Sequence, residues 1–422
     1  MKVRFMSLFA VFLLLLVALT VRLGYIQLLK GGEYRQQVKK QSLSLISEIP
    51  VRGTIYDREN RPLTNAEKGF YVLVDEVKVN DEFEAIINQV RAGKVDSNSD
   101  KYRIYSIPKI SSQALNKLFA DYGVLVLEYS LRDDLYQSAI HVIGGISPVN
   151  HMGLWGIEKD YDHILSSEQR MFYALNDGQG NLISGNRINI ESDGHHWGVL
   201  TTLDLDIQTA AEKSLKRCIK PGTVIVVDLK TGEVLAFAST LNSSLEPQNE
   251  MYKAEFLSQL IITGAALEKC VDSGQVSVLE NIDIVEIAKA LGMTSNGVAN
   301  LNSQSSGNFN ELMLTPMQVA RLNRTLANDG RDQQLTLIRG TLEGVRGASL
   351  LPKGKERQVI SADTSRVLKD LLEEIVEEGG NWYTGYVPWE GPIYGITVYA
   401  DGNNAENGCA ALLFKDVAER IR

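Results

Sequence analysis

The chain has 422 residues, of which 44% are hydrophobic and 23% are charged. This composition is ordinary for a globular protein, and the length allows two or three domains with sizeable cores. The net charge of -9 indicates a solvated acidic surface and argues against a nucleic-acid-binding protein.

An uncharged apolar segment over residues 5–21 is the first predicted element. As a helix rising about 1.5 Å per residue it spans roughly 25 Å, and the apolar residues 23–29 extend it towards the thickness of a bilayer core. Lys2 and Arg4 precede it, which predicts a cytoplasmic N-terminus. We therefore predict a single transmembrane anchor over residues 1–30, with the bulk of the chain extracytoplasmic. A cleaved signal peptide is the alternative, but no clear small-x-small cleavage site follows the apolar run.

The segment over residues 51–75 reads VRGTIYDRENRPLTNAEKGFYVLVD. It predicts a tight turn, a short strand ending at Tyr56, a charged turn and a second strand over residues 70–74. Alternating arginine and aspartate side chains could form a buried ion-pair network, and we expect them to hold this hairpin together rather than to take part in catalysis. The residues of this structural motif are Arg52, Gly53, Asp57 and Arg58.

Residues 76–140 carry little signal, apart from a polar stretch over residues 91–101 that predicts a loop. The next pattern, HVIGGISPVNHMGLWGIEKDYDHIL, begins at His141 and predicts residues packed around a turn. We expect neither His141 nor Glu158 to be catalytic.

Cysteine and histidine residues give no metal-site signal. Cys218, Cys270 and Cys409 are widely spaced and show neither a metal nor a redox pattern. Because three cysteines cannot all pair within one chain, we expect buried free thiols, although the sequence leaves the state of each one open. His195 and His196 are adjacent but have no third ligand at useful spacing, so no metal site is predicted.

A domain boundary is expected near residue 196. After it, VLTTLDLDIQTAAEKSL predicts a short strand ending near Leu203 and a helix capped by Asp204 or Asp206. The segment GTVIVVDLKTGEVLAFAS, which begins at Gly222, predicts a β-hairpin because two apolar β-branched runs flank turn residues.

Helical patterns follow the hairpin. Apolar residues at three- and four-residue steps predict a buried helix that ends at residues 272–274, and its inward positions are Leu257, Leu260, Ile261 and Ala265. Thr315, Pro316 and Gln318 predict a capping box at the start of another helix, which ends at residues 328–330. Further helices are predicted over residues 283–292, 361–380 and 415–421, and strands over residues 382–387, 393–399 and 409–413.

The segments described above resemble the class B penicillin-binding proteins, a family of peptidoglycan D,D-transpeptidases. The family pattern R-G-x-I-x-D-R near the start of the periplasmic part matches residues 52–58, and the family hairpin with T-G-E-V-L-A matches residues 231–236. The resemblance implies an α+β protein with an N-terminal transmembrane helix and an elongated α/β pedestal, or dimerisation domain, over residues 31–195. A serine β-lactamase/D,D-peptidase-like domain, an antiparallel sheet flanked by helices, would occupy residues 196–422 in shortened form.

The resemblance also implies where the active site should lie, and the sequence departs from the family there. In the family an S-x-x-K motif supplies the acylated serine and the lysine that accepts its proton. Family spacing, counted back from Glu268, puts Phe256 in the serine position and Gln259 in the lysine position. The motif Ser306-Gly307-Asn308 matches the family's S-x-N tripeptide, and we interpret that match as chance.

The third family motif, a K-T-G strand, is also missing. No K-T-G, K-S-G or H-T-G occurs in the chain, and almost nothing separates Gly380 from Trp382, where that strand should lie. The catalytic strand is therefore expected to be deleted. Loss of one nucleophile alone costs a factor on the order of a million in rate in such systems.

These departures predict a penicillin-binding-protein homologue in the bacterial cytoplasmic membrane that has lost catalysis. It would act as a scaffold or regulator of a cell-wall glycosyltransferase, with a polytopic glycosyltransferase or other cell-wall synthesis proteins as partners, peptidoglycan as a further candidate ligand, and no cofactor. The alternative is an active D,D-transpeptidase with a displaced nucleophile such as Ser258, which has Ile261 rather than a base one turn on. The sequence leaves the partner, and the choice between elongation, division and sporulation, open.

Overall fold

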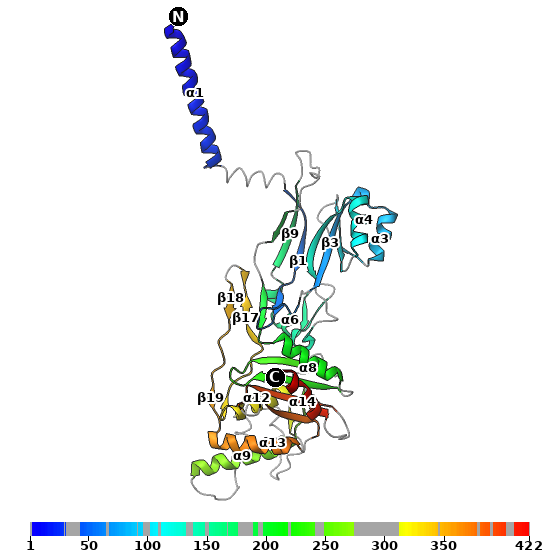
Figure 1. The fold of residues 1–422 in the computed structure, drawn as a ribbon, viewed down its shortest axis with the longest axis vertical. Helices are drawn as coiled ribbons and strands as arrows, with labels where there is room; N and C mark the ends of the chain where they lie inside the picture. Colours follow the sequence, from blue (N-terminus) through cyan, green and yellow to red (C-terminus); the bar gives the residue numbers. More distant parts are fainter. Residues whose placement is uncertain are drawn as a thin grey trace. The chain divides into compact units, whose positions relative to one another are not determined.

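The computed structural model divides the chain into two compact units, which are described separately (Figure 1). Unit 1 comprises Met1–Val51, Lys68–Tyr129 and Gln169–Gly194, and unit 2 comprises Arg52–Glu67, Ser130–Glu168 and His195–Arg422. The residues whose structure is described are 2–28, 30, 43–64, 67–90, 92–95, 102–108, 111–131, 138–147, 152–166, 168–175, 189–192, 197–217, 221–240, 249–273, 312–344, 347–377, 380–388, 391–401 and 409–421.

These units differ from the predicted domains, because parts of the predicted pedestal group with the C-terminal residues. Arg52–Glu67 and Ser130–Glu168 belong to unit 2 by their contacts. The pedestal over residues 31–195 and the transpeptidase-like domain over residues 196–422 therefore stay predictions about functional domains.

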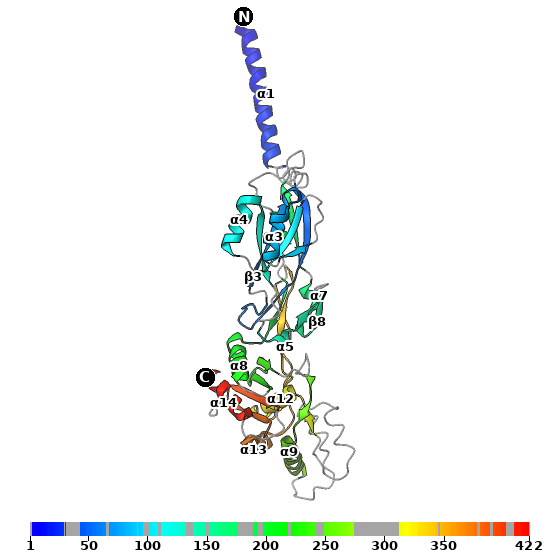
Figure 2. The same cartoon turned by 90° about the vertical axis from the view of Figure 1, so that its right-hand side faces the viewer.

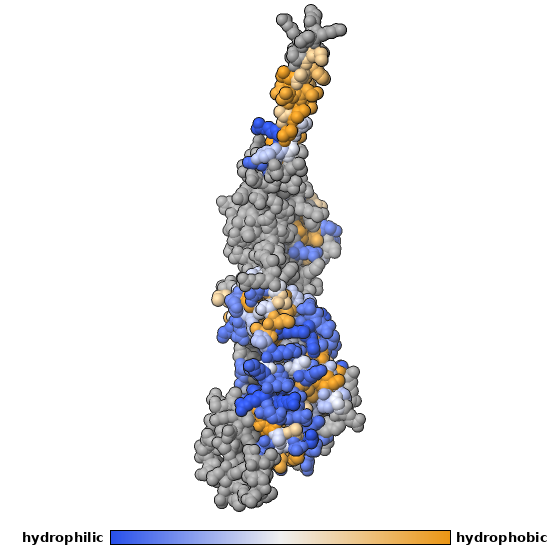
Figure 3. Space-filling model, turned by 90° about the vertical axis from the view of Figure 1, so that its left-hand side faces the viewer, coloured by the Kyte–Doolittle hydropathy of each residue, from blue (hydrophilic) through white to orange (hydrophobic). Residues whose placement is uncertain are grey.

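Unit 1 begins with the long helix α1, Lys2–Leu28. The 18 residues Phe9–Ile26 are apolar and long enough to cross a membrane, and none of them is buried against the rest of the protein. Apolar side chains dominate the described surface of this helix in the hydropathy view (Figure 3). The helix agrees with the predicted apolar element, and it is consistent with either a membrane anchor or a signal sequence.

The body of unit 1 contains a four-stranded sheet and two helices. The sheet has the strand order β4-β5-β3-β6, and its strands are β3 (Glu67–Asp75), β4 (Gly93–Val95), β5 (Tyr102–Ile107) and β6 (Leu125–Leu131). Helices α3 (Asp81–Gln89) and α4 (Ser112–Tyr122) pack on it around Phe83, which is fully buried. Asn80 caps α3 by accepting a hydrogen bond from the Phe83 N–H at 2.9 Å.

Two predictions for this region have different outcomes. The strand expected over residues 70–74 is confirmed within β3. The loop expected over residues 91–101 is wrong in part, because Gly93–Val95 forms β4 and pairs antiparallel with β5. Pairing with a neighbouring strand overrides the low strand propensity of these residues. A second sheet of unit 1 has the order β1-β9-β10, with β1 (Leu43–Val51), β9 (Glu168–Leu175) and β10 (Asn189–Ser192).

Unit 2 is built around an antiparallel sheet of the order β13-β12-β21-β20. The predicted hairpin is confirmed as β12 (Gly222–Asp228) and β13 (Val234–Ser239), and β21 (Tyr394–Ala400) and β20 (Trp382–Val387) complete the sheet. All residues of β12 from Gly222 to Val227 are buried, which explains why the strand reads as a continuous apolar run instead of an alternating one.

Helices cover both faces of this sheet, as the two perpendicular views show (Figures 1 and 2). Helices α8 (Leu205–Arg217) and α14 (Cys409–Ile421) share a core with one face, through residues such as Leu215, Val224 and Val417. On the other side, a second core joins α9 (Phe256–Ser273), α12 (Pro316–Ala327) and α13 (Ala362–Glu377) to Trp382 and Tyr399 of the sheet.

A second sheet in unit 2 has the order β18-β17-β11-β2. Its strands are β2 (Thr54–Tyr56), β11 (Gly198–Thr201), β17 (Ile338–Leu342) and β18 (Ala348–Leu350). The predicted strand ending at Tyr56 is confirmed as β2, which pairs in parallel with β11. Short elements complete the unit, namely α5 (Ile140–Ile143), β7 (Gly145–Ile146), β8 (Gly153–Trp155), α6 (Ile157–Asp160), α7 (Asp162–Leu165), β14 (Tyr252–Lys253), β15 (Met313–Leu314), β16 (Arg331–Asp332) and β19 (Arg357–Gln358).

The strand predicted over residues 409–413 is wrong, because these residues form the first turns of α14. Ala410, Leu413 and Val417 are buried at three- and four-residue steps, so the apolar run is one face of a helix that continues to Ile421. The helices predicted over residues 315–330 and 361–380 are confirmed as α12 and α13, whereas the one predicted over residues 283–292 lies outside the described residues.

Candidate functional site

The start of α9 is the place where the family resemblance puts the nucleophile. Ala254, just before the helix, donates its N–H to the carbonyl oxygen of Leu312 at 2.8 Å, and β14 pairs with β15 beside it. Helix α9 then begins at Phe256, and its inward positions Leu257, Leu260, Ile261 and Ala265 are buried as predicted. The main-chain hydrogen bond of Ala254 and the pairing of β14 with β15 thus hold the residues just before α9 in place.

Phe256 belongs to an aromatic cluster that we define by Tyr252, Phe256, Trp382 and Tyr399. The ring centroids of Phe256 and Trp382 lie 6.3 Å apart, and those of Trp382 and Tyr399 lie 4.8 Å apart. Tyr252 stacks on Tyr399 with centroids 4.2 Å apart. The Trp382 indole N–H donates to the carbonyl oxygen of Lys253 at 2.7 Å, so the polar atom of the largest ring is also satisfied.

The other expected positions offer no catalytic arrangement. Gln259 is exposed, and the Ser258 hydroxyl donates to the carbonyl oxygen of Glu255 at 2.5 Å. Ile261, one turn after Ser258, is buried in the core. A serine held by its own helix backbone and followed by a buried isoleucine has no adjacent base at this spacing to remove its proton.

Two buried tyrosine hydroxyls of the central sheet are also unavailable as proton acceptors. Burial raises the pKa of Tyr399 to about 12, and the charge of Asp401 adds to that rise. Burial alone raises the pKa of Tyr386, whose hydroxyl donates to the carbonyl oxygen of Asn323 at 3.1 Å. Both phenols therefore stay protonated near neutral pH.

The connection between α13 and β20 consists of residues 378–381 alone, because α13 ends at Glu377 and β20 begins at Trp382. Strands in globular proteins are usually at least about three residues long and need turns at both ends. This connection is therefore too short for an additional strand beside β20, and the loss of the K-T-G strand stays a prediction. In the described part of unit 2, β21 is the strand that pairs with β20.

The remaining sequence features considered for this site either have a structural role or lie outside the described residues. Thr315 and Gln318 form the predicted capping box of α12: the Thr315 hydroxyl accepts from the Gln318 N–H at 3.2 Å, and the Gln318 side chain accepts from the Thr315 N–H at 2.8 Å. Ser306-Gly307-Asn308 and the pair His195 and His196 lie outside the described residues. The described residues contain no group of three or more histidine, cysteine, aspartate or glutamate side chains able to hold a metal ion.

The structure places Arg52 of the 52–58 motif in an ion-pair cluster of unit 2. Its guanidinium lies 2.6 Å from the Glu158 carboxylate and 2.8 Å from the Asp162 carboxylate, and the Glu158 side chain is 1% exposed. Gly53 adjoins this cluster in close backbone contact, since a Cβ there would lie 2.6 Å from the carbonyl oxygen of Trp197. The Gly53 N–H donates to the Leu165 carbonyl oxygen at 2.6 Å.

Asp57 and Arg58 brace the second half of the same motif. The Asp57 carboxylate accepts hydrogen bonds from the N–H groups of Glu59 and Arg61 at 2.9 and 2.7 Å, and from the Arg61 guanidinium at 2.6 Å. The Arg58 guanidinium lies 3.6 Å from the Glu233 carboxylate in the turn between β12 and β13. This geometry fits the expected structural role. The motif is distant from the aromatic cluster in the sequence, and it packs in a different hydrophobic core.

Two polar clusters were missed by the sequence analysis. The Gln208 amide and the Glu212 carboxylate tie α8 to Phe237 and to the turn before α5. Arg324, in the middle of α12, is fully buried and donates to Gln333 at 2.7 Å and to Glu356 at 2.9 Å. The partners of Arg324 and the Phe237 partner of Gln208 are set by tertiary contacts, so local sequence patterns do not indicate either cluster.

The expectation that the cysteines are free thiols is wrong for Cys409, which forms a disulfide bond. The described residues do not include the Cys218 and Cys270 side chains, which are the possible partners within the chain. A disulfide bond is consistent with folding in an oxidising, extracytoplasmic compartment. Pairing within the chain leaves one of the three cysteines outside the disulfide bond.

The fold of this chain matches that of solved penicillin-binding proteins over nearly its whole length. A structure of penicillin-binding protein 3 from Mycobacterium tuberculosis complexed with aztreonam aligns with 89% of this chain and 96% of its own, with a TM-score of 0.55 and 16% identity. Another aligned chain comes from a structure described as "Structural coordination of polymerization and crosslinking by a peptidoglycan synthase complex". It aligns with 99% of this chain and 98% of its own, with a TM-score of 0.58 and 17% identity.

Sequence comparison agrees with the fold. Residues 282–381 match the family described as "Penicillin binding protein transpeptidase domain". The Peptidoglycan D,D-transpeptidase FtsI of Buchnera aphidicola is 25% identical over 275 residues, which are 59% of this chain and 47% of that protein. The chain spans about half or less of the length of the curated relatives it matches. It is a homologue of the penicillin-binding protein transpeptidase family and resembles the class B members.

Proposed function

We propose that this protein takes part in peptidoglycan synthesis as a non-catalytic, membrane-anchored homologue of the class B penicillin-binding proteins. It acts by binding, as a scaffold or regulator of a cell-wall glycosyltransferase. The observation that carries the proposal is the aromatic cluster, because the Phe256 ring packs against Trp382 at the position where the family resemblance expects a nucleophilic serine.

Three further features support the loss of catalysis. The Gln259 side chain replaces the expected lysine and is exposed, and the Ser258 hydroxyl is engaged by the Glu255 carbonyl oxygen. The connection of residues 378–381 leaves no room for the strand that carries the family's K-T-G motif. Acyl transfer needs a nucleophile, a base and an oxyanion site held together, and here the first two are absent from the expected positions.

The proposed partner class rests on the structural relatives. One chain of similar fold is described as part of a peptidoglycan synthase complex that coordinates polymerization and crosslinking. A chain that keeps this fold, an apolar N-terminal helix and the braced 52–58 motif could keep such a partnership without its own chemistry. We therefore extend the partnership to this protein, with a polytopic glycosyltransferase of the bacterial cytoplasmic membrane as the expected partner and the bulk of the chain outside the cytoplasm.

Intact-mass measurement tests the loss of catalysis. The full-length protein, purified in detergent and shown to be folded, is incubated with a reactive β-lactam beside an active class B penicillin-binding protein as the positive control. We expect a stoichiometric adduct on the control and no mass shift on this protein. An adduct on Ser258, lost in Ser258→Ala, would overturn the proposal in favour of a transpeptidase with a displaced nucleophile.

Crosslinking in native membranes tests the partner. The full-length protein carrying an affinity tag is crosslinked, captured and compared with an unrelated single-span membrane protein captured in the same way. We expect enrichment of a polytopic glycosyltransferase by the tagged protein alone. If cell-wall synthesis proteins are recovered equally with both baits, the scaffold proposal is wrong even when the β-lactam result is negative.

A further inference from the structure

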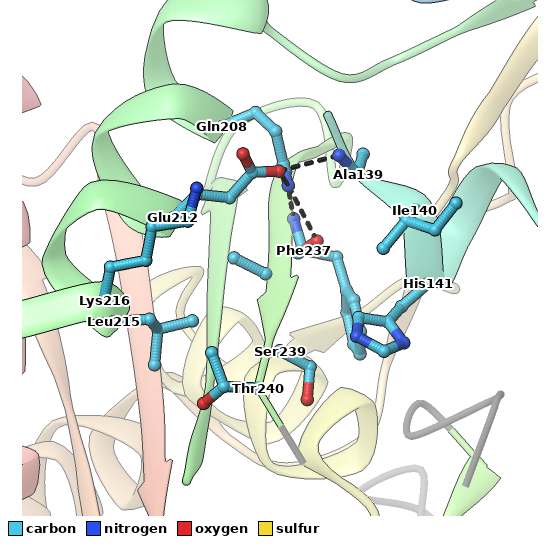
Figure 4. A pocket seen from close by; sticks show the side chains of 11 residues that line it. Ala139, Ile140, His141, Gln208, Glu212, Leu215, Lys216, Phe237, Ser239 and Thr240 are labelled. Atoms are coloured by element: carbon cyan, nitrogen blue, oxygen red, sulfur yellow. Dashed lines mark hydrogen bonds between the residues drawn. The ribbon is translucent and has the colours of Figure 1, made fainter. Parts of the chain in front are cut away.

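A cavity of about 260 Å³ lies within unit 2 (Figure 4), and none of its lining residues belongs to the aromatic cluster. Its walls come from three elements: His141 and Ile140 of α5, the α8 residues Glu212 and Lys216, and the end of β13. Ligand pockets for drug-sized molecules enclose roughly 300–1,000 Å³, so this cavity suits a smaller molecule. It belongs to neither the expected active site nor the 52–58 motif.

Hydrogen bonds between its walls hold the cavity in shape. Gln208 joins α8 to the main chain of Phe237. One oxygen of the Glu212 carboxylate accepts from the Ala139 N–H at 2.7 Å and from the Ser138 hydroxyl at 3.0 Å, which joins α8 to the turn before α5. Figure 4 shows the bonds that join Gln208 and Glu212 to Phe237 and Ala139 as dashed lines. Because these bonds already order the lining residues, a ligand loses little binding free energy to ordering them.

Helix α8 contributes one negatively and one positively charged side chain to the lining of the cavity. Glu212 and Lys216 are four residues apart on α8, so their side chains share a helix face about 5–6 Å apart at the Cβ atoms. No ion pair of the Lys216 ammonium is found within the described part of the protein. One cation and one anion at this spacing match a ligand that carries both charges close together.

The other lining residues match the rest of such a ligand. Leu215, Ile140 and Ala238 give an apolar floor, and the Ser239 and Thr240 hydroxyls lie at the end of β13. A small apolar side chain fits the floor. The two hydroxyls already contact the Gly222 carbonyl oxygen of β12 at 3.4 Å, so they line the cavity without adding free donors.

From this arrangement we propose that the cavity binds a small zwitterion, a free amino acid. The carboxylate of the ligand pairs with Lys216 and its ammonium group pairs with Glu212. The site is a binding site distinct from any acyl-transfer chemistry, and it stands whether or not the protein is a scaffold for a glycosyltransferase.

Saturation-transfer NMR with three related molecules tests the charge pattern. The full-length protein in detergent is titrated with L-alanine, with N-acetyl-L-alanine, which lacks the positive charge, and with L-alaninamide, which lacks the negative one. We expect L-alanine to bind in the millimolar range and each single-charge analogue to bind roughly tenfold more weakly, because each loses one charge-assisted hydrogen bond. Equal binding of all three molecules, or no binding of L-alanine, would overturn the proposal.

Matched variants test the location. Lys216→Gln should weaken L-alanine binding roughly tenfold, whereas Lys213→Gln, an exposed lysine of the same helix that does not line the cavity, should leave it unchanged. Glu212→Gln keeps an oxygen that can accept from Ala139, and it should reverse the preference so that N-acetyl-L-alanine binds better than L-alanine. Equal losses in the Lys213 and Lys216 variants would place the binding elsewhere and contradict the proposal, and unfolding of the Glu212 variant would leave the lysine pair as the deciding test.

Discussion

The side-chain amide of Gln208 pairs with both main-chain polar groups of Phe237. Its oxygen accepts a hydrogen bond from the Phe237 N–H at 2.8 Å, and its nitrogen donates to the Phe237 carbonyl oxygen at 3.0 Å. Both residues are fully buried, and the same amide nitrogen reaches Glu212 at 2.8 Å. One side chain of α8 thereby satisfies polar groups of β13 that water cannot reach.

We predict that Gln208→Leu destabilises unit 2 by about 3 kcal/mol, because it leaves the Phe237 N–H and carbonyl oxygen buried without partners. All four tryptophans of the chain lie in unit 2, so tryptophan fluorescence during urea unfolding reports this unit. The matched control is Lys213→Ala, an exposed position on the same helix, which should change the free energy of unfolding by less than about 0.5 kcal/mol. Equal stability of the two variants would show that the pairing contributes nothing.

A second prediction concerns the ion pair of Arg52 with Glu158. The Glu158 side chain is 1% exposed, so removing the counter-charge that Arg52 supplies in Arg52→Met should cost about 3–5 kcal/mol of unfolding free energy. The exposed pair of Arg366 and Asp363 supplies the control. Arg366→Met should cost less than about 1 kcal/mol in the same urea titration. A small effect at Arg52 would mean that water reaches the cluster.

The acid sensitivity of unit 2 should depend on Asp162. Burial alone would raise the pKa of this carboxyl, but the hydrogen bond from the Gly153 N–H and the charge of Arg52 outweigh burial and lower it. Because the folded-state pKa is depressed, the stabilisation is complete above the unfolded pKa of about 4 and is lost as the pH falls through the folded-state value.

Asp162→Asn should therefore flatten the decrease in unfolding free energy below about pH 4, measured by urea titrations at successive pH values. Asp363→Asn, at a side chain that is 88% exposed, should leave that decrease as it is in the wild type. An unchanged slope in the Asp162 variant would refute the assignment.

The aromatic cluster leads to a prediction about restored motifs. The double variant Phe256→Ser with Gln259→Lys recreates the family's S-x-x-K spacing on α9 but supplies no K-T-G strand. We expect it to form no covalent adduct with a β-lactam by intact mass, and to lose about 2 kcal/mol of stability because the half-buried Phe256 ring no longer contacts Trp382. Acylation of the double variant would show that the rest of an active site is already present.

The disulfide of Cys409 gives a fifth prediction. The guanidinium of Arg217, the last residue of α8, lies 3.4 Å from the carboxylate of Asp416 in α14. The C-terminal end of α8 is therefore close to α14. Cys218 follows Arg217 directly in the sequence, and we therefore predict that Cys218 is the partner of Cys409. Peptide mapping without reductant should recover these two cysteines crosslinked and Cys270 alkylated. A crosslink between Cys270 and Cys409 would contradict this pairing.

The sequence correctly predicted those elements whose formation depends mainly on residues close together in the chain. The hairpin β12–β13 combines β-branched runs with turn residues, and the capping box of Thr315 and Gln318 needs only its own four residues. The expected active-site positions could be located because Phe256 and Gln259 lie at fixed spacing from a recognisable helix end.

Other features depend on contacts between distant segments and were not readable in advance. The apolar run after Cys409 is compatible with a buried strand or a buried helix, and only packing against α8 and the sheet decides for α14. The Phe237 partner of Gln208 is 29 residues away in the sequence, and the partners of Arg324 are up to 32 residues away. Polar side chains of this kind take their roles from the tertiary structure, so sequence spacing alone does not indicate them.

The edge strand β13 has a consequence for how the protein stays soluble. An open strand edge can recruit a strand from another copy and start aggregation. Along β13, the carbonyl oxygen of Leu235 accepts from the Asp204 N–H at 2.8 Å, and both polar groups of Phe237 are occupied by Gln208. The start of α8 thus closes this edge against neighbouring molecules, so β13 is protected from pairing with a strand of another copy.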